Sequence, residues 1–316
     1  MLVLTRSDVE ALLDLDALVD ALAAAHAELS AGTVSLAPRV GAIAERDGLL
    51  AAMPAHVPGT GLGCKLVTVF PHNNTAPSHQ ALIALFDSRT GTPAVLMDGT
   101  YITAVRTAAA AALAARLLAR PAARVLAILG TGVQARAHAR AFAGIREWDE
   151  IRVAGRDRRR ASALADELGA TPCSFEAAVR GADVVAATTH SSEPVVRAGW
   201  VSPGTHVGSV GYAPPGSELD SALVRAADVL AVESRLVAFS PPPAGAPELA
   251  GIDPQQAVEL GELVGGTRAG RTDPEQITLY TSVGIAVQDL AAAALVLAAA
   301  RERDAGLEIE LEEIRA

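Results

Sequence analysis

Beyond Pro121, short apolar runs alternate along the chain with segments of helical composition. The run 123–129 leads into a predicted helix over 133–143, and the run 151–154 leads into another over 161–168. Alternation of this kind is typical of a parallel sheet with helices on both faces. Further short apolar runs follow at a similar spacing, over 182–188, 206–208, 229–232 and 277–280.

Before Pro121 the pattern is different. Residues 7–29 predict two short helices, because Ser7 and Glu10 form a capping-box pattern and apolar residues recur at helical spacing. His26 lies in this region, and we expect it to have a structural role. Long helices are predicted over 101–118 and 284–301. Between the N-terminal helices and the helix over 101–118, β-rich runs separated by turn residues predict an antiparallel sheet; the runs are 39–44, 49–53, 63–70 and 81–87.

The composition limits the class of protein. With 316 residues, the chain is longer than most single hydrophobic cores, so we expect two domains. Half of the residues are hydrophobic, which is enough to bury a sizeable core. The net charge of −10 disfavours nucleic acid or an anionic membrane as a partner. Cys64 and Cys173 lack metal or redox spacing, and a cytoplasmic location is the simplest expectation.

We expect neither a signal peptide nor a membrane span. The N-terminus has no basic stretch followed by an apolar one, and the Ala-rich runs 108–115 and 291–300 are too short to cross a bilayer. No grouping of histidine, cysteine and carboxylate residues has metal-ligand spacing, so no metal site is predicted.

A glycine motif follows the apolar run 123–129. Gly130 permits a tight turn, Gly132 lets the backbone approach a pyrophosphate, and Ala135 allows the helix to pack close to the strand. The free N–H groups at the helix start favour an anion. The motif predicts a dinucleotide site that includes Gly130, Gly132 and Thr188, the last residue of the run 182–188. A structural turn that binds nothing is the alternative.

The residues after the run 151–154 bear on cofactor choice. An acid at this position accepts hydrogen bonds from a ribose 2′-hydroxyl, whereas arginine accommodates a 2′-phosphate. Gly155 stands where the acid is expected, and Arg156 begins an arginine-rich segment that Asp157 interrupts. We therefore expect NADP in preference to NAD. In the alternative interpretation, Asp157 binds the ribose and the arginines begin a solvated helix.

Three cations stand among apolar neighbours in the first part of the chain, namely Arg39, Lys65 and Arg106. Burying an unpaired charge costs several kcal/mol, and few acids lie near them in the sequence. A ligand carboxylate would suit all three, since arginine binds it in a bidentate manner and lysine adds a point charge. For each residue alone, a structural role is equally plausible.

Short segments in this order carry a more specific pattern: Met53-Pro54, 65–71, 102–109, 129–135, Ser282-Val283-Gly284 and Asp289-Leu290. Together they resemble the signature of the ornithine cyclodeaminase/mu-crystallin family over nearly the whole chain. The resemblance implies an α/β fold: a Rossmann-type doubly wound parallel sheet plus a second α+β domain with an antiparallel sheet. It implies a Rossmann dinucleotide-binding domain over 120–285. It also implies a substrate-binding and dimerisation domain over 1–119 with 286–316, and a homodimer joined through that domain.

The same resemblance implies roles for individual residues. Arg39, Lys65 and Arg106 match the family's carboxylate-binding and catalytic cations. Substrates of the family are amino acids, oxo acids or cyclic imino acids. The positions at which members contact the nicotinamide cofactor correspond to Thr107, Val133, Gln134, Arg156, Val210 and Ser282.

One position departs from the family pattern. Ornithine cyclodeaminases and the similar alanine dehydrogenases carry an aspartate in a loop where this chain has Tyr212. A phenol with a pKa of about 10 is a poor base but a competent acid or hydrogen-bond donor. The mu-crystallin branch, whose members reduce cyclic ketimines, also lacks the aspartate. We therefore expect reduction of a C=N bond with a nicotinamide cofactor.

In the expected reaction, Arg39, Lys65 and Arg106 bind the carboxylate of a cyclic α-imino acid such as pyrroline- or piperideine-2-carboxylate. The imine nitrogen is protonated by Lys65 through a water, by His79 or by Tyr212. We also expect the neighbouring cations to lower the pKa of Lys65. The alternatives are an alanine dehydrogenase, an ornithine cyclodeaminase, a non-enzymatic binding protein, or a structural Rossmann protein.

Overall fold

The computed structural model describes residues 1–213, 215–241 and 244–310. They form two compact units: the described residues of 1–106 with those of 285–316, and the described residues of 107–284. The division falls inside one helix, α3 (Gly99–Leu118), which contributes residues to both units. The domain boundaries expected from the sequence, after 119 and after 285, remain a prediction, and residues 311–316 of the predicted first domain lie outside the described residues.

The first unit is built on a mixed sheet. Its strands lie in the order β16-β1-β7-β6-β5-β4-β2, and β3 also pairs with β4. Neighbouring strands are antiparallel except β1 and β7, which are parallel. The strands are β1 (Leu2–Leu4), β2 (Ser35–Leu36), β3 (Val40–Ile43), β4 (Leu49–Val57), β5 (Gly61–Val69), β6 (His79–Phe86), β7 (Pro93–Asp98) and β16 (Leu307–Glu308).

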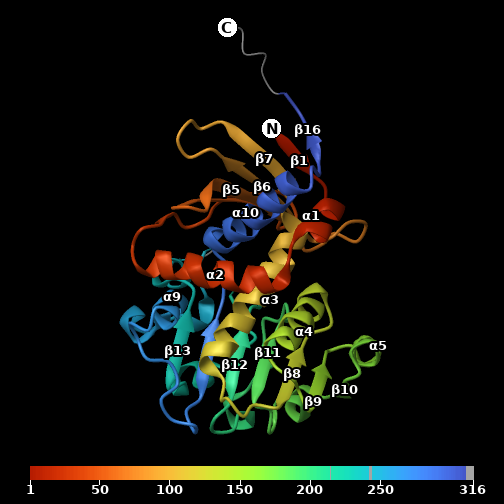
Figure 1. Cartoon of the computed structure of the whole chain (residues 1–316). Helices are drawn as coiled ribbons and strands as arrows, with labels where there is room; N and C mark the ends of the chain where they lie inside the picture. The colour runs from red at the N-terminus through yellow and green to blue at the C-terminus, as the bar shows by residue number, and fades with distance from the viewer. Residues whose placement is uncertain (214, 242–243, 311–316) are drawn as a thin grey trace. The chain divides into compact units, whose positions relative to one another are not determined.

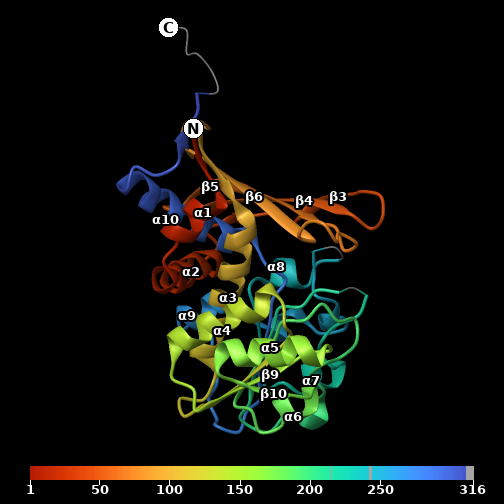
Figure 2. The ribbon, with the colours of Figure 1, turned by 90° about the vertical axis from the view of Figure 1, so that its right-hand side faces the viewer.

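Three helices complete this unit: α1 (Arg6–Leu12), α2 (Leu15–Ser30) and α10 (Ala286–Glu302). Helix α10 packs on β4, β5 and β6, and α2 lies beside α10 (Figures 1 and 2). A Cβ atom at Gly63 of β5 would lie 3.4 Å from Cγ of Leu290. Because side chains alternate along a strand, α10 covers the sheet face that also carries Lys65.

The start of α1 differs from the prediction. Thr5 is the N-cap, and its side chain accepts a hydrogen bond from the backbone N–H of Asp8, whose carboxylate accepts one from the N–H of Thr5. The predicted pair Ser7 and Glu10 is therefore wrong, because both residues already lie within the helix. The sequence offers two overlapping capping-box patterns, Thr5 with Asp8 and Ser7 with Glu10, and the helix begins at the first of them. Helix α2 is also longer than expected, at 16 residues.

The second unit contains a wholly parallel sheet with strand order β10-β9-β8-β11-β12-β15-β13-β14. The strands run on either side of β8, so right-handed connections place helices on opposite faces. The predicted α/β fold class is confirmed. The strands are β8 (Val125–Leu129), β9 (Glu150–Ala154), β10 (Thr171–Cys173), β11 (Val184–Ala187), β12 (His206–Ser209), β13 (Val229–Val232), β14 (Val258–Glu259) and β15 (Thr278–Thr281).

Short connecting helices accompany these strands. Asp157, Ser174 and Asp220 cap three of them through side-chain oxygens that accept backbone N–H groups. The helices are α4 (Val133–Ile145), α5 (Arg158–Leu168), α6 (Phe175–Val179), α7 (Ser221–Ala226), α8 (Arg235–Ala238) and α9 (Leu260–Val264).

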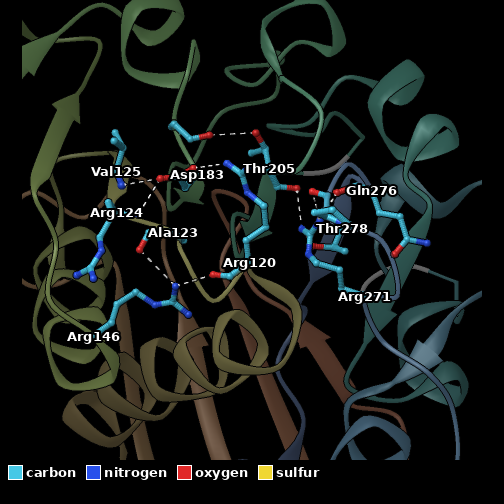
Figure 3. Close-up of polar contacts among 12 residues, drawn as sticks. Arg120, Ala123, Arg124, Val125, Arg146, Asp183, Thr205, Arg271, Gln276 and Thr278 are labelled. Carbon is cyan, nitrogen blue, oxygen red and sulfur yellow. Dashed lines mark hydrogen bonds and ion pairs between the residues drawn. The ribbon is translucent and has the colours of Figure 1, made fainter.

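Arginines hold the C-terminal end of α3 in the second unit (Figure 3). Arg271 donates to the backbone oxygen of Leu118 at 2.7 Å, and Arg146 donates to that of Arg120 at 2.8 Å. Arg120 in turn pairs with Asp183. Cations at a helix C-terminus stabilise it, because they satisfy carbonyl groups and oppose the helix dipole. Helix α3, which carries Arg106 and Thr107, is thereby fixed at its far end.

By length and composition alone, α3 would pass for a membrane-crossing helix, and 83% of its most apolar window is buried inside the protein. Its run Ala108–Ala115 is fully buried. Small side chains allow neighbouring backbones to approach closely, which explains how a chain with few aromatic residues fills its core.

Candidate active site

Lys65 lies on the covered face of the first unit's sheet, and only 2% of the residue is exposed. It stands opposite Met53 of β4 and Ile83 of β6 in the strand register. Because side chains alternate, His79 at the start of β6 belongs to the same face. The residues beside Lys65 in β5 are apolar or β-branched and favour a strand. Within the sheet, this strand places the lysine where water is excluded.

A buried carboxylate compensates Lys65. Its Nζ lies 2.7 Å from Oδ2 of Asp289, which is fully buried on α10. The other carboxylate oxygen, Oδ1, accepts a hydrogen bond of 2.9 Å from Nε of Arg106 on α3. Two cations from a strand and a helix thus share one carboxylate from a second helix. The three groups depend on one another, because removing the carboxylate or a cation would leave a buried charge without its partner.

The environment sets the pKa of Lys65 to about 7. Burial is the largest cause, since it disfavours the charged form, and the charges of Arg106 and Arg39 lower the pKa further. Asp289 opposes them by raising it. The expectation that the neighbouring cations lower this pKa is confirmed in direction. An amine with a pKa near 7 exchanges protons readily at neutral pH.

His79 lies within the electrostatic reach of the same group. Burial, and then the charges of Lys65 and Arg106, lower its pKa to about 4. At neutral pH its imidazole is therefore uncharged and has no spare proton to lose as an acid. Its role stays a prediction, but this protonation state favours hydrogen bonding over proton donation.

The sequence interpretation missed Asp289 as the partner of the cations. The motif Asp289-Leu290 was used only for the resemblance, and the absence of nearby acids in the sequence suggested a ligand carboxylate as the partner. That reasoning was incomplete, because the acid is supplied by α10 from more than 180 residues away from Arg106. An aspartate inside a buried Ala-rich helix was the signal that could have found it.

In the second unit, the expected cofactor residues gather at one edge of the sheet. Gly130, Arg156, Thr188, Val210 and Ser282 each stand one or two positions after the last residue of a parallel strand. The carboxyl ends of parallel strands meet at the same edge, where ligands bind in open α/β sheets. Thr107 lies apart from this set, near the start of the second unit on α3.

The glycines have the geometry that a dinucleotide requires. Gly130 has a φ of +127°, and a Cβ there would lie 2.6 Å from Oγ1 of Thr188. These two residues follow β8 and β11, the adjacent strands at which the strand order reverses. Gly132 is the N-cap of α4 without a side-chain cap, and a Cβ there would meet nothing within 4 Å. Open space before uncapped N–H groups fits a pyrophosphate.

Two further groups border this helix start. Val133 is 69% exposed, so its side chain is open to a ligand. Oε1 of Gln134 is buried and, among the described residues, has no hydrogen-bond partner. Both features suit a ligand that covers the valine and donates to the amide, and the site therefore fits a dinucleotide.

The carboxylate of Asp157 is already engaged. Its Oδ1 caps α5 by accepting the N–H groups of Arg159 at 2.9 Å and Arg160 at 3.2 Å. Its Oδ2 lies 3.6 Å from Nε of Arg160. Arg156 is exposed beside it. The only acid in this turn thus caps its own helix with one oxygen and has an arginine beside the other.

Two buried glutamates, which the sequence interpretation also missed, tie down the loops after β12 and β15. Glu218 accepts hydrogen bonds from Ser209, Gly211 and Thr189, and burial raises its pKa. Glu233 accepts them from the Ser282 hydroxyl at 2.5 Å and from the N–H groups that follow. The first loop carries Val210 and the half-buried Tyr212, and the second carries Ser282.

Known proteins resemble the chain over most of its length. The model of the ornithine cyclodeaminase/mu-crystallin family matches residues 1–304. The ketimine reductase mu-crystallin of Mus musculus is 40% identical over 261 residues, which cover 80% of this chain and 81% of that protein.

Solved structures agree with this match. The Δ1-pyrroline-2-carboxylate reductase of Thermococcus litoralis, solved in complex with NADH and L-proline, superposes with a TM-score of 0.91 at 33% identity, covering 98% of this chain and 100% of that one. An archaeal alanine dehydrogenase dimer with bound NAD gives a TM-score of 0.91 at 31% identity, with 99% of each chain covered.

Proposed function

This chain belongs to the ornithine cyclodeaminase/mu-crystallin family, and we propose that it is an NAD(P)H-dependent reductase of a cyclic α-imino acid such as pyrroline- or piperideine-2-carboxylate. The observation that carries the proposal is the group formed by Lys65, Arg106 and Asp289. Two buried cations share one carboxylate, so with Lys65 in its ammonium form a positive charge remains for a substrate carboxylate to balance. This group of side chains would therefore bind an anionic substrate more strongly than a neutral one.

Arg106 is oriented for this role. Its Nε and Nη1 donate to Asp289 and Gln288, and among the described residues its Nη2 makes no hydrogen bond. The protein thus holds the guanidinium at two of its three nitrogens, and Nη2 is left to donate to a carboxylate oxygen. Arg39, whose charge acts on Lys65, would bind the same carboxylate.

Reduction of an imine adds a hydride to carbon and a proton to nitrogen. When bound, the reduced nicotinamide supplies the hydride. Lys65 is the best-suited proton donor in the first unit, because its pKa of about 7 lets its ammonium group release a proton near neutral pH. The carboxylate of Asp289 stays ionised beside it, since the charges of Arg106 and Lys65 hold its pKa below the ordinary value despite burial. Tyr212 remains an alternative donor.

The second unit would bind the cofactor, with Gly130, Gly132 and Val133 facing the pyrophosphate. We infer a preference for NADPH. Asp157 faces its own helix as a cap and has Arg160 beside its second oxygen, which disfavours it as a ribose ligand, whereas the exposed Arg156 has no acid partner in this turn among the described residues. An arginine in this position accommodates a 2′-phosphate.

The purified chain is expected to oxidise NADPH when Δ1-pyrroline-2-carboxylate or Δ1-piperideine-2-carboxylate is added, with a lower KM for NADPH than for NADH. The measurement is the loss of absorbance of the reduced cofactor, with product identified by mass spectrometry. Pyruvate with ammonia and L-ornithine serve as parallel substrates. Faster turnover of pyruvate with ammonia, or release of ammonia from ornithine, would overturn the proposal, as would no reaction with either imine.

We also propose that a second copy of the chain covers the outer face of the first unit's sheet. On this face Val40, Leu66 and Leu82 lie in one register row across β3, β4, β5 and β6, with Ala52 between the first two. Their exposed fractions are 65%, 45% and 48%. A contiguous exposed apolar row is typical of an interaction surface.

Light scattering during gel filtration is expected to give twice the chain mass for the wild type and the mass of one chain for Leu66→Lys. A lysine in the middle of the row would place a charge in an apolar interface, which is strongly unfavourable. Leu236→Lys is the matched control, because Leu236 is 59% exposed on α8 and lies outside the row. A monomeric wild type, or a Leu66→Lys variant that keeps the dimer mass, would contradict this interface.

A further inference from the structure

We propose that His26 is a positioning residue that orients Arg106 through Gln288; its consequence for substrate binding rests on the proposed function. The three side chains form a chain of hydrogen bonds from α2 through α10 to α3. Nη1 of Arg106 donates to Oε1 of Gln288 at 2.8 Å, and Nε2 of Gln288 lies 3.1 Å from Nε2 of His26.

The direction of each hydrogen bond follows from the donors available. A guanidinium has only N–H donors, so the oxygen of the Gln288 amide must face Arg106. The amide nitrogen must then face His26, and it can only donate. Nε2 of His26 therefore accepts, which requires a neutral ring with its proton on Nδ1. His26 thus determines which way the amide of Gln288 points.

Burial makes this orientation consequential. His26 and Gln288 are fully buried, and Arg106 is 4% exposed. Water is therefore not at hand to replace a lost acceptor, and an unsatisfied buried amide is costly. Without the imidazole, the amide gains by rotating toward another partner, which would turn N–H groups toward the guanidinium. Asp289 alone would then hold Arg106, by Nε, and the position of Nη2 would no longer be defined.

The expected kinetic result distinguishes positioning from packing. In His26→Leu we expect the KM for the imine to rise about tenfold, because carboxylate binding is affected first. We expect kcat and the Kd of NADPH to change less than about twofold. In His26→Gln the side-chain oxygen can accept in place of Nε2, and the KM returns to within about twofold of the wild type. The control is Leu18→Ala, which creates a cavity beside the same helix. It is expected to lower the melting temperature without changing KM.

A double-variant comparison tests the connection through Gln288. Since His26 acts on Arg106 only by way of the amide, His26→Leu with Gln288→Leu is expected to raise KM no more than Gln288→Leu alone. Multiplicative effects would overturn the proposal. So would a rise in KM of the same size in Leu18→Ala.

One readout does not depend on any substrate. The 15Nε–H resonance of Arg106, assigned by its loss in Arg106→Lys, is expected to shift in His26→Leu and to stay near its wild-type position in His26→Gln. An unchanged resonance in His26→Leu would overturn the proposal. If the resonance behaves as expected in a chain that reduces no imine, the proposed function fails while the positioning of Arg106 by His26 stands.

Discussion

Replacing Lys65 with methionine is expected to lower kcat for the imine by about 10²- to 10⁴-fold, the usual contribution of a positioned acid or base. Methionine has similar length and suits the apolar strand, but it has no proton to give. The Kd of NADPH is expected to change less than about twofold, because the residues proposed to hold the cofactor belong to the second unit. Stopped-flow single turnovers and a fluorescence titration measure the two quantities.

Lys65→Arg is the matched variant for this experiment. It keeps a positive charge for the carboxylate, but a guanidinium does not lose its proton near neutral pH. We expect a comparable loss of kcat with a smaller rise in KM than in Lys65→Met. If Lys65→Met retains wild-type kcat, Lys65 is not the proton donor and Tyr212 becomes the leading choice.

For the wild type, kcat/KM is expected to fall as the pH rises through about 7, because the ammonium form of Lys65 is the donor. Lys65 is the only lysine in the sequence. Labelling the protein with 13C-lysine therefore gives a single Cε resonance, and its pH titration reports the pKa of this group directly.

The fold was largely predictable where local patterns dominate. Six of the eight described strands of the second unit were expected, because short apolar runs alternate with helical segments, and the turn at Gly130 was expected because the glycine motif directly follows such a run. The strands β10 and β14 were not predicted, since they span only three and two residues. The three-residue strand β1 and the strand β7 were not predicted, since each is too short or too irregular to show a period. Their parallel pairing is a long-range contact that makes the first sheet mixed rather than antiparallel.

The site was only half predictable, for a related reason. Lys65 and Arg106 were noticeable because a charge among apolar neighbours needs a partner. The partner, Asp289, lies far away in the sequence, and no local rule indicates which acid will meet which base. The same limit applies to His26, whose helical setting suggested only a structural role. Its hydrogen bond to Gln288 exists because α2 lies beside α10.

Replacing Asp289 with asparagine is expected to lower the pKa of Lys65 below its wild-type value of about 7, since Asp289 is the group that raises it. The shape of the side chain is retained, but two buried cations lose their carboxylate. Breaking a buried pair in this way typically costs about 3 to 5 kcal/mol of stability. The Cε resonance of 13C-labelled Lys65 measures the first effect, and urea unfolding measures the second.

The loss of stability in Asp289→Asn should itself depend on pH. Between the lowered pKa of the variant and about 7, native wild-type protein binds more protons at Lys65 than the native variant does. Stability of the wild type relative to the variant therefore falls as the pH rises through about 7. We expect a larger deficit at pH 6 than at pH 9, where Lys65 is neutral in both proteins and only Arg106 lacks its partner.

Asp183→Asn is the control for this comparison, because it breaks the ion pair with Arg120 in the second unit. It is expected to destabilise the protein without moving the Lys65 resonance. The falling limb of the kcat/KM profile should shift to lower pH in Asp289→Asn and stay in place in Asp183→Asn. A Lys65 pKa that is unchanged or raised in Asp289→Asn would show that the carboxylate does not hold the ammonium in its charged form, and that the proton is supplied from elsewhere.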